Sequence, residues 1–179
     1  MLLDADERLP PGGVECLRVW AENAPAAVAA CRLPIRSHLG ARFLRWGGYF
    51  PAARVRLIRR DAARWSPDRV HERPILVGRT VDVRLPIDHF GYRDLDHARE
   101  KTRRYAAWAA EERGAAGRHP VALDTFIRVG WRWLRVYLLR GGWLMGRLGW
   151  QLAGLQARGV WWRDRWIRHG APPDAGRPP

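Results

Sequence analysis

The sequence predicts an α/β fold in which a small sheet region is followed by amphipathic helices. Three observations support this class. Short apolar runs of strand length alternate with turn residues before residue 94. A long helical pattern then begins, and seven of the 11 tryptophans follow residue 120, within helical periodicity. The first part therefore predicts a sheet and the second a set of helices.

The elements of the sheet region are expected in the following order. A short helix suits Pro10–Asn23, with Val14, Leu17 and Val19–Trp20 as its apolar positions. Between the first two of the expected strands lies a turn-rich stretch, Gly40–Pro51. The apolar runs predict four strands, at Ala26–Arg32, Val55–Ile58, Ile75–Val77 and Val81–Leu85.

Three helices are expected after the strands. The first runs from Asp94 to Arg113, with Asp94 as its N-cap and Gly114 as its stop. Two more follow residue 120 and are interrupted at Gly141-Gly142. Arg128, Arg132 and Arg135 share one stripe of the earlier of these two. In the later one, large apolar side chains fall within an arc of about 80° at ~100° per residue: Leu144, Leu148, Leu152, Leu155, Trp162 and Trp166.

Composition narrows the class of protein. With 179 residues, of which 47% are hydrophobic and 28% charged, a buried core is feasible and wholesale disorder is excluded. The formal charge is +14, but Lys101 is the only lysine, and this arginine bias is typical of a GC-rich genome. The charge is therefore weak support for nucleic-acid binding, and no zinc-finger spacing or RNA-binding signature accompanies it.

The cysteines and the hydropathy suggest where the chain works. Cys16 and Cys31 provide neither a disulfide framework nor a metal quartet, so a reducing compartment is expected. No apolar run approaches the ~18 residues of a transmembrane helix, and no signal peptide follows Met1. We therefore expect a cytoplasmic location.

The first residues hold a candidate metal site. Leu2 and Leu3 lead directly into Asp4-Ala5-Asp6, which places two carboxylates at the end of an expected strand. Hard cations such as Mg²⁺ or Mn²⁺ prefer oxygen ligands and often bridge to phosphates. An acid-x-acid triplet is also common in solvated turns and helix caps, and both interpretations stay open on the triplet alone.

Several segments in a fixed order resemble one family. Leu3–Leu9 (LDADERL) resembles a segment of bacterial family 2 glycosyltransferases of the branch that builds lipopolysaccharide cores and similar glycans. Five further segments follow in that family's order: Gly47–Pro51, Arg56–Arg60, Val70–Glu72, Ile87–Tyr92 and Tyr137–Gly142. A helix carrying Lys101 and Tyr105 lies between the last two. Each segment is weak by itself, and their order over most of the chain gives the resemblance its specificity.

The resemblance implies a GT-A fold, a Rossmann-like sheet that binds a nucleotide-sugar donor. It implies that residues 1–93 are the C-terminal half of that domain. The composition predicts that 94–169 form a Trp/Arg-rich membrane-proximal extension and that 170–179, rich in Pro and Gly, are a disordered tail. The segment that holds the nucleotide-binding half in that family does not precede Leu2. We therefore expect either a longer working form or a fragment, and little activity from this chain by itself.

The resemblance also implies roles for individual residues. Asp4, Asp6 and His89 are the expected ligands of a divalent cation, with Asp6 as the first choice, and Asp4 and Arg56 are expected to contact the donor. Glu72 is the expected base, with Asp61 and Asp68 as lesser candidates. Each role has a plain alternative: an ion-paired Glu72, a structural His89, and a solvated strand edge at Arg56, Arg59 and Arg60. The aromatic cluster of Trp46, Tyr49 and Phe50 is either a sugar-stacking wall or ordinary core.

The C-terminal region predicts an interfacial element. Tryptophan favours the membrane headgroup boundary, and arginine is attracted to lipid phosphates. A lipid-linked glycan acceptor at the inner face of the cytoplasmic membrane would make such docking useful. The alternative is that the Leu/Trp face packs on the catalytic domain or on another subunit. The competing function is a catalytically inactive remnant that binds a membrane or a partner.

Overall fold

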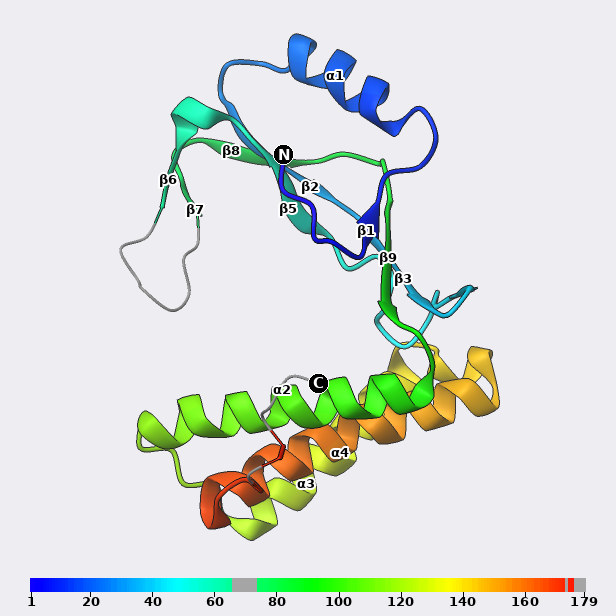
Figure 1. Cartoon of the computed structure of the whole chain (residues 1–179), viewed down its shortest axis with the longest axis vertical. Helices are drawn as coiled ribbons and strands as arrows, with labels where there is room; N and C mark the ends of the chain where they lie inside the picture. Colours follow the sequence, from blue (N-terminus) through cyan, green and yellow to red (C-terminus); the bar gives the residue numbers. More distant parts are fainter. Residues whose placement is uncertain (66–73, 173, 176–179) are drawn as a thin grey trace. The chain divides into compact units, whose positions relative to one another are not determined.

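The computed structural model describes residues 1–65, 74–172 and 174–175, and it is a mixed α/β protein (Figure 1). Two compact units divide the chain. The N-terminal unit comprises Met1–Arg45 and Tyr49–Gly91, and the C-terminal unit comprises Trp46–Gly48 and Tyr92–Pro179. Trp46–Gly48 belongs with the helices because the Gly47 N–H donates to the Arg140 carbonyl at 2.8 Å. The division falls two residues before the boundary expected from the sequence.

The N-terminal unit contains one helix and nine short strands among its described residues. Its helix, α1, spans Gly13–Asn23, and a 3-10 turn, η1, spans Arg60–Ala62. The strands are β1 Glu7–Arg8, β2 Val28–Leu33, β3 Ile35–Leu39, β4 Arg42–Phe43, β5 Arg54–Ile58, β6 Ala63–Trp65, β7 Pro74–Leu76, β8 Arg79–Asp82 and β9 Ile87–Tyr92.

These strands form three small sheets. The four-stranded sheet has the order β1-β9-β3-β4, the three-stranded sheet β5-β2-β8, and the third pairs β6 with β7. In the three-stranded sheet, β2 runs antiparallel to β5 and parallel to β8, so this sheet is mixed. The apolar run Val28–Cys31 of β2 is buried, as suits a central strand, whereas Arg32 is exposed and pairs with Asp82 of β8.

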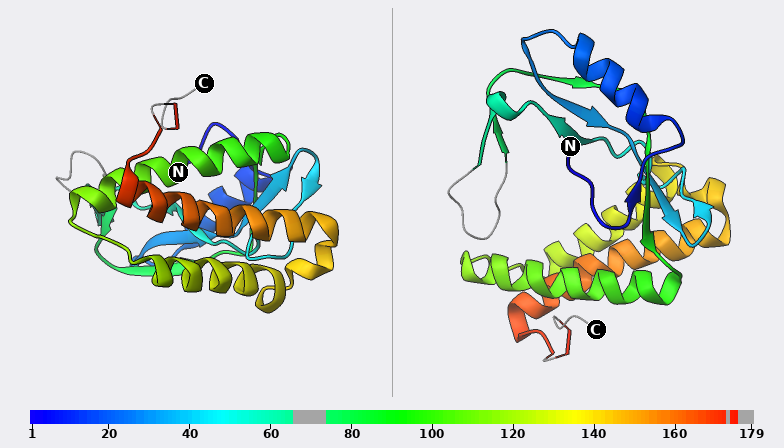
Figure 2. Two further views of the ribbon diagram at one scale, coloured as in Figure 1. Left: turned by 90° about the horizontal axis from the view of Figure 1, so that it is seen from below. Right: turned by 45° about the horizontal axis from the view of Figure 1, so that its top comes forward.

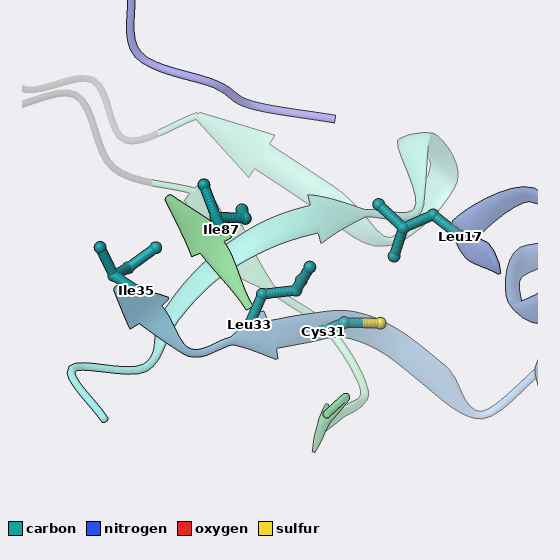
Figure 3. Packing of buried hydrophobic residues seen from close by; sticks show 5 residues of the cluster. All are labelled: Leu17, Cys31, Leu33, Ile35 and Ile87. Carbon is teal, nitrogen blue, oxygen red and sulfur yellow. The ribbon is translucent and has the colours of Figure 1, made fainter. Parts of the chain in front are cut away.

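The core of this unit lies where α1, β2, β3 and β9 meet. Figure 3 shows its five buried residues: Leu17, Cys31, Leu33, Ile35 and Ile87. Leu33 and Ile87 have no exposed surface. Leu17 is the one α1 position among the expected apolar set that is fully buried, whereas Val14 is 70% exposed.

The C-terminal unit is a group of helices. Its elements are α2 Leu95–Ala115, α3 Ala122–Leu134, the π-helical turn η2 Arg135–Leu139, the 3-10 turn η3 Gly142–Met145 and α4 Arg147–His169. Both α2 and α3 pack along α4 (Figures 1 and 2). Small residues permit this approach, since a Cβ added at Gly159 of α4 would lie 2.9 Å from Thr102 Cγ2 of α2.

Several sequence-based boundaries are confirmed, and others are wrong for identifiable reasons. Asp94 caps α2 as expected, its carboxylate accepting from the His97 N–H at 2.7 Å. The helix does not stop at Gly114, however, but continues to Ala115. The first glycine beyond it in the left-handed region is Gly117, at φ +71°, and glycine ends a helix through that conformation. The turn-rich stretch Gly40–Pro51 also contains the short strand β4, and the sequence pattern did not predict β3.

The helix face expected to be interfacial is largely buried in the C-terminal unit. Leu152, Leu155 and Trp166 of α4 are all less than 10% exposed. These side chains pack among α2, α3 and α4 of their own unit, which is neither the membrane nor the catalytic domain or second subunit expected from the sequence, while Leu144 of the same expected face is 47% exposed. In the expected tail, residues 173 and 176–179 lie outside the described set, and Ala175 packs on the cluster that contains Ala106 and Trp166.

Candidate functional site

The candidate site lies where the N-terminal residues reach β9 and β5. β1 pairs antiparallel with β9, with Glu7 opposite His89. Around this ladder, the Phe90 N–H donates to the Asp6 carbonyl at 2.9 Å, and the Leu2 N–H donates to the Arg56 carbonyl at 2.8 Å. These backbone bonds hold the segment with three carboxylates beside the basic side chains of β5 and β9.

Arg56 joins two of the carboxylates. Its Nη2 donates to Asp4 Oδ2 at 2.8 Å and also to Glu7 Oε1. The Glu7 side chain is only 2% exposed, whereas that of Asp4 is 63% exposed. Glu7 is therefore a buried anion whose charge is balanced by Arg56, while the pair with Asp4 lies at the surface. Arg56 Nε is buried without a hydrogen-bond partner in the described part of the chain.

The third carboxylate, of Asp6, faces a different basic group. His89 Nε2 lies 3.2 Å from Asp6 Oδ2, and the two side chains are 26% and 40% exposed. Gly91 makes room for this imidazole, because a Cβ at that position would lie 2.6 Å from His89 Cε1. The Asp6–His89 pair is thus positioned on β1 and β9 and remains accessible to solvent.

The neighbouring residue on β9 forms a separate ion-pair group. Asp88 Oδ1 lies 2.9 Å from His38 Nε2 and 3.4 Å from Arg36 Nη1. The His38 ring also stacks on Phe90, with centroids 4.7 Å apart. Successive strand residues face opposite sides, so Asp88 is directed away from the face that His89 occupies. We assign this group to holding β3 against β9.

The residues present fit a divalent cation only in part. In the ranges described, no three His, Cys, Asp or Glu side chains are grouped to hold a metal, so Asp4, Asp6 and His89 do not form a three-ligand set. Magnesium-type sites on phosphorylated substrates often use only one or two protein ligands, the rest being phosphates and waters. Asp6 supplies one accessible carboxylate of that kind, and ligation of a metal by His89, which lies against Asp6, stays a prediction. Asp4 is instead engaged by Arg56, and its ligation of a metal stays a prediction.

The other predicted site residues are distributed as follows. Glu72 and Asp68 lie outside the described residues. Asp61 is exposed in η1. The Arg59 guanidinium donates to the Val28 carbonyl at 3.2 Å, which ties it to β2. The aromatic cluster is divided between the units, since Trp46 belongs to one and Tyr49 and Phe50 to the other.

A second candidate surface lies on α3. Seven apolar side chains of α3 and η2 are between 36% and 68% exposed: Leu123, Phe126, Ile127, Trp131, Leu134, Leu138 and Leu139. All but the last follow helical spacing, and at ~100° per residue they cover an arc of about 140°. We call these seven residues the α3 apolar face. Trp143 and Leu144, in η3, are also exposed, at 54% and 47%.

Arginines border the α3 apolar face along one side. At ~100° per residue, Arg128, Arg132 and Arg135 occupy the arc next to the apolar one. Burial and the like charges of Arg135, Arg140 and Arg163 lower the pKa of Arg132, which reflects a local excess of positive charge. On the remaining side, Thr125 of α3 and Val136 of η2 are buried. In the described ranges, no helix is long and apolar enough to cross a membrane.

Sequence reasoning missed two features of these surfaces. The sequence did not distinguish Glu7 from the other acidic residues near the N-terminus. Its burial follows from the pairing of β1 with β9. The α3 apolar face was also a periodic pattern in the sequence, but the membrane-binding role was predicted from the similar stripe on α4. Comparison with known proteins adds no assignment, since no family model and no solved structure matches the chain.

Proposed function

We propose that this chain belongs to an inverting glycosyltransferase of GT-A type. In this proposal it transfers a sugar from a nucleotide-sugar to a lipid-linked or lipopolysaccharide-core glycan at the cytoplasmic face of the inner membrane. The observation that carries the proposal is the solvent-accessible Asp6–His89 pair beside the Arg56–Asp4 pair. Carboxylate, imidazole and guanidinium groups are those that bind a metal–diphosphate. The order of family-like segments supports the same reaction class.

The residues take the following roles in this reaction. The acceptor hydroxyl oxygen attacks the anomeric carbon, and the bond from that carbon to the diphosphate breaks with its electron pair on the leaving oxygen. Glu72 accepts the hydroxyl proton. Asp6 and His89 would hold Mg²⁺ or Mn²⁺, which when bound would stabilise the charge developing on the diphosphate. Arg56, which is paired with Glu7 and Asp4, contacts the donor diphosphate through its guanidinium, and Asp4 orients that group.

The test is genetic, because it examines the protein in the form in which the cell makes it. Deleting the gene in the source organism is expected to shorten a lipid-linked glycan by the mass of one sugar in mass spectrometry. The wild-type gene is expected to restore that mass, and Asp6→Asn is not. Asp96→Asn is the matched control, since the Asp96 side chain is 96% exposed on α2 and is expected to restore it fully. An unchanged glycan in the deletion strain, or full restoration by Asp6→Asn, contradicts the proposal.

A second candidate function, membrane binding, is favoured by the α3 apolar face. An amphipathic helix with an exposed apolar stripe and bordering arginines suits insertion at the headgroup boundary of an anionic bilayer. This docking serves the transferase at its lipid-linked acceptor, and in an inactive remnant it would be the whole function. The two candidates are separated by the deletion experiment above.

Vesicle sedimentation tests the docking directly. The wild-type protein is expected to sediment with vesicles containing phosphatidylglycerol, and Phe126→Asp/Trp131→Asp is expected to lose that binding. Val14→Asp is the control, because Val14 is a 70% exposed apolar residue of α1, outside the α3 apolar face. Equal sedimentation of the double variant and the control would contradict docking through α3.

A further inference from the structure

A pocket at the turn between α2 and α3 carries an excess of arginine. Its volume is about 270 Å³, and the charged groups that line it come from the end of α2, the connecting turn, α3 and α4. Six of the lining residues are titratable: Arg113, Arg118, His119, Asp124, Arg128 and Asp164. We call this the arginine pocket. It lies within the C-terminal unit and is separate from the Asp6–His89 site.

The buried acid of the pocket is already occupied by partners. Asp164 is 1% exposed, and its Oδ1 lies 2.8 Å from Arg163 Nη2. Its Oδ2 lies 3.1 Å from Arg128 Nη2 and accepts from the Thr125 hydroxyl at 3.3 Å. Both carboxylate oxygens are therefore engaged, and Asp164 is an internal counter-ion for two arginines at once.

In the part of the chain that the structure describes, Arg113 and Arg118 have no comparable partner. Within the described ranges, no carboxylate lies at ion-pair distance from Arg113 or Arg118. Burial, together with the positive charges of Arg163, Arg118 and Arg128, lowers the pKa of Arg113, and only Asp164 opposes the shift. With Arg163, which is paired with Asp164 but does not line the pocket, four guanidinium groups stand against the two carboxylates of Asp164 and Asp124, an excess of two positive charges before His119 is counted.

The size and charge of the pocket match a phosphate monoester. Drug-sized ligands occupy pockets of about 300 to 1,000 Å³, so the arginine pocket is sized for a smaller group. Arginine forks match phosphate oxygens in geometry. A phosphate monoester carries a charge of about −1.5 to −2 near pH 7, which balances the two excess positive charges.

The neighbourhood of the pocket indicates the source of the phosphate. Asp124 and Arg128 line the pocket, while Leu123 and Ile127, each next to one of them in sequence, belong to the α3 apolar face and are 68% and 60% exposed. A ligand with a phosphate in the pocket and a hydrocarbon chain would therefore meet an apolar helix surface. Such a molecule is a lipid with a terminal phosphate.

We propose that the arginine pocket binds the terminal phosphate of a phosphomonoester lipid whose chains lie on the α3 apolar face. The proposal rests on the membrane docking proposed above and deepens it, because it names a headgroup chemistry. Arg113 and Arg118 bind the phosphate directly, while Arg128 is held in place by Asp164. Docking by charge alone would not distinguish lipids of equal charge, whereas this pocket does.

Vesicles test the selectivity. Phosphatidic acid is expected to bind the wild-type protein at least about tenfold more tightly than phosphatidylglycerol at matched total charge, since charge-assisted hydrogen bonds are strong. Arg113→Gln/Arg118→Gln is expected to lose this preference and to keep its affinity for phosphatidylglycerol. Arg99→Gln/Arg158→Gln removes the same charge from exposed sites of the same unit and is expected to keep the preference. Equal affinities of the wild-type protein for the two lipids would overturn the proposal.

A soluble ligand separates the pocket from the membrane. Short-chain phosphatidic acid, titrated below its micelle concentration, is expected to bind the wild-type protein and to bind Arg113→Gln/Arg118→Gln at least about tenfold more weakly. That result upholds the pocket even where vesicle binding fails. If inorganic phosphate binds as tightly as the short-chain lipid, the pocket recognises free phosphate and the lipid assignment is overturned. Circular dichroism confirms that each variant is folded.

Discussion

Arg56 provides the sharpest test of the packing at the candidate site. The Arg56→Met substitution removes the guanidinium from the Glu7 side chain, which is 2% exposed, and leaves a buried carboxylate without its counter-ion. Breaking a buried pair in this way costs about 3 to 5 kcal/mol. The Asp4→Asn substitution breaks a pair whose acid is 63% exposed, and such pairs contribute only about 0.2 to 1 kcal/mol. We therefore expect a difference of at least about 2 kcal/mol between the two variants.

The assay must report on the N-terminal unit alone. Cys31 is 1% exposed in its core, so the rate at which a thiol reagent modifies it measures the opening of that unit. In a Cys16→Ser background, Arg56→Met is expected to raise the modification rate about 100-fold, since 1.4 kcal/mol corresponds to tenfold. The Arg56→Met/Glu7→Gln double variant is expected to recover most of the loss, because no buried charge is then unpaired.

Two results would refute the role of Arg56 as the counter-ion of buried Glu7. If Arg56→Met and Asp4→Asn raise the modification rate of Cys31 by the same small factor, Glu7 is not a buried anion that depends on Arg56. If the double variant is as unstable as Arg56→Met, the loss comes from packing of the arginine stem and not from the unpaired charge.

Four further predictions follow from three positions, Gly91, Cys31 and Gly149. Gly91→Ala is expected to displace the His89 ring, because the added Cβ would lie 2.6 Å from Cε1, and the change is checked by the histidine signals in NMR spectra. Burial raises the pKa of the Cys31 thiol to about 11, so at pH 8 iodoacetamide is expected to modify exposed Cys16 and spare Cys31 in mass spectrometry. Because the unfolded Cys31 thiol ionises first, the N-terminal unit is expected to lose stability as the pH rises from about 9 towards 11, measured by urea unfolding. Gly149→Ala is expected to destabilise the C-terminal unit by at least about 3 kcal/mol in thermal unfolding, since its Cβ would collide with a backbone oxygen of the turn before α4.

Local signals predicted the helices well. The Asp94 cap, the break at Gly141 and the periodicity of α4 are determined by neighbours within one or two turns, and the structure confirms each of them. The short strands were harder to predict. β3 is a polar strand that is stabilised by pairing in the β1-β9-β3-β4 sheet. The residue pattern of Ile35–Leu39 does not predict that pairing.

The candidate sites show the same division between local and distant information. The chemistry of Asp4, Asp6 and His89 could be proposed from residue type, but only the fold assigns Asp4 to Arg56 and Asp6 to His89. Likewise, α3 and α4 each carry an apolar stripe in the sequence. Packing between α2, α3 and α4 decides which stripe is buried, and periodicity within one helix carries no information about that choice.

The most direct test of the central claim is the binding of Mn²⁺ with a diphosphate at the Asp6–His89 site. Free Mn²⁺ is measured by electron paramagnetic resonance, with inorganic pyrophosphate as a probe that needs no nucleoside pocket. Pyrophosphate is expected to tighten Mn²⁺ binding by the wild-type protein, and Asp6→Asn is expected to weaken it at least about tenfold, as for loss of a ligand. Asp96→Asn is expected to match the wild-type protein. Equal Mn²⁺ affinity of Asp6→Asn and the wild-type protein would contradict the assignment of this site as the donor-binding centre.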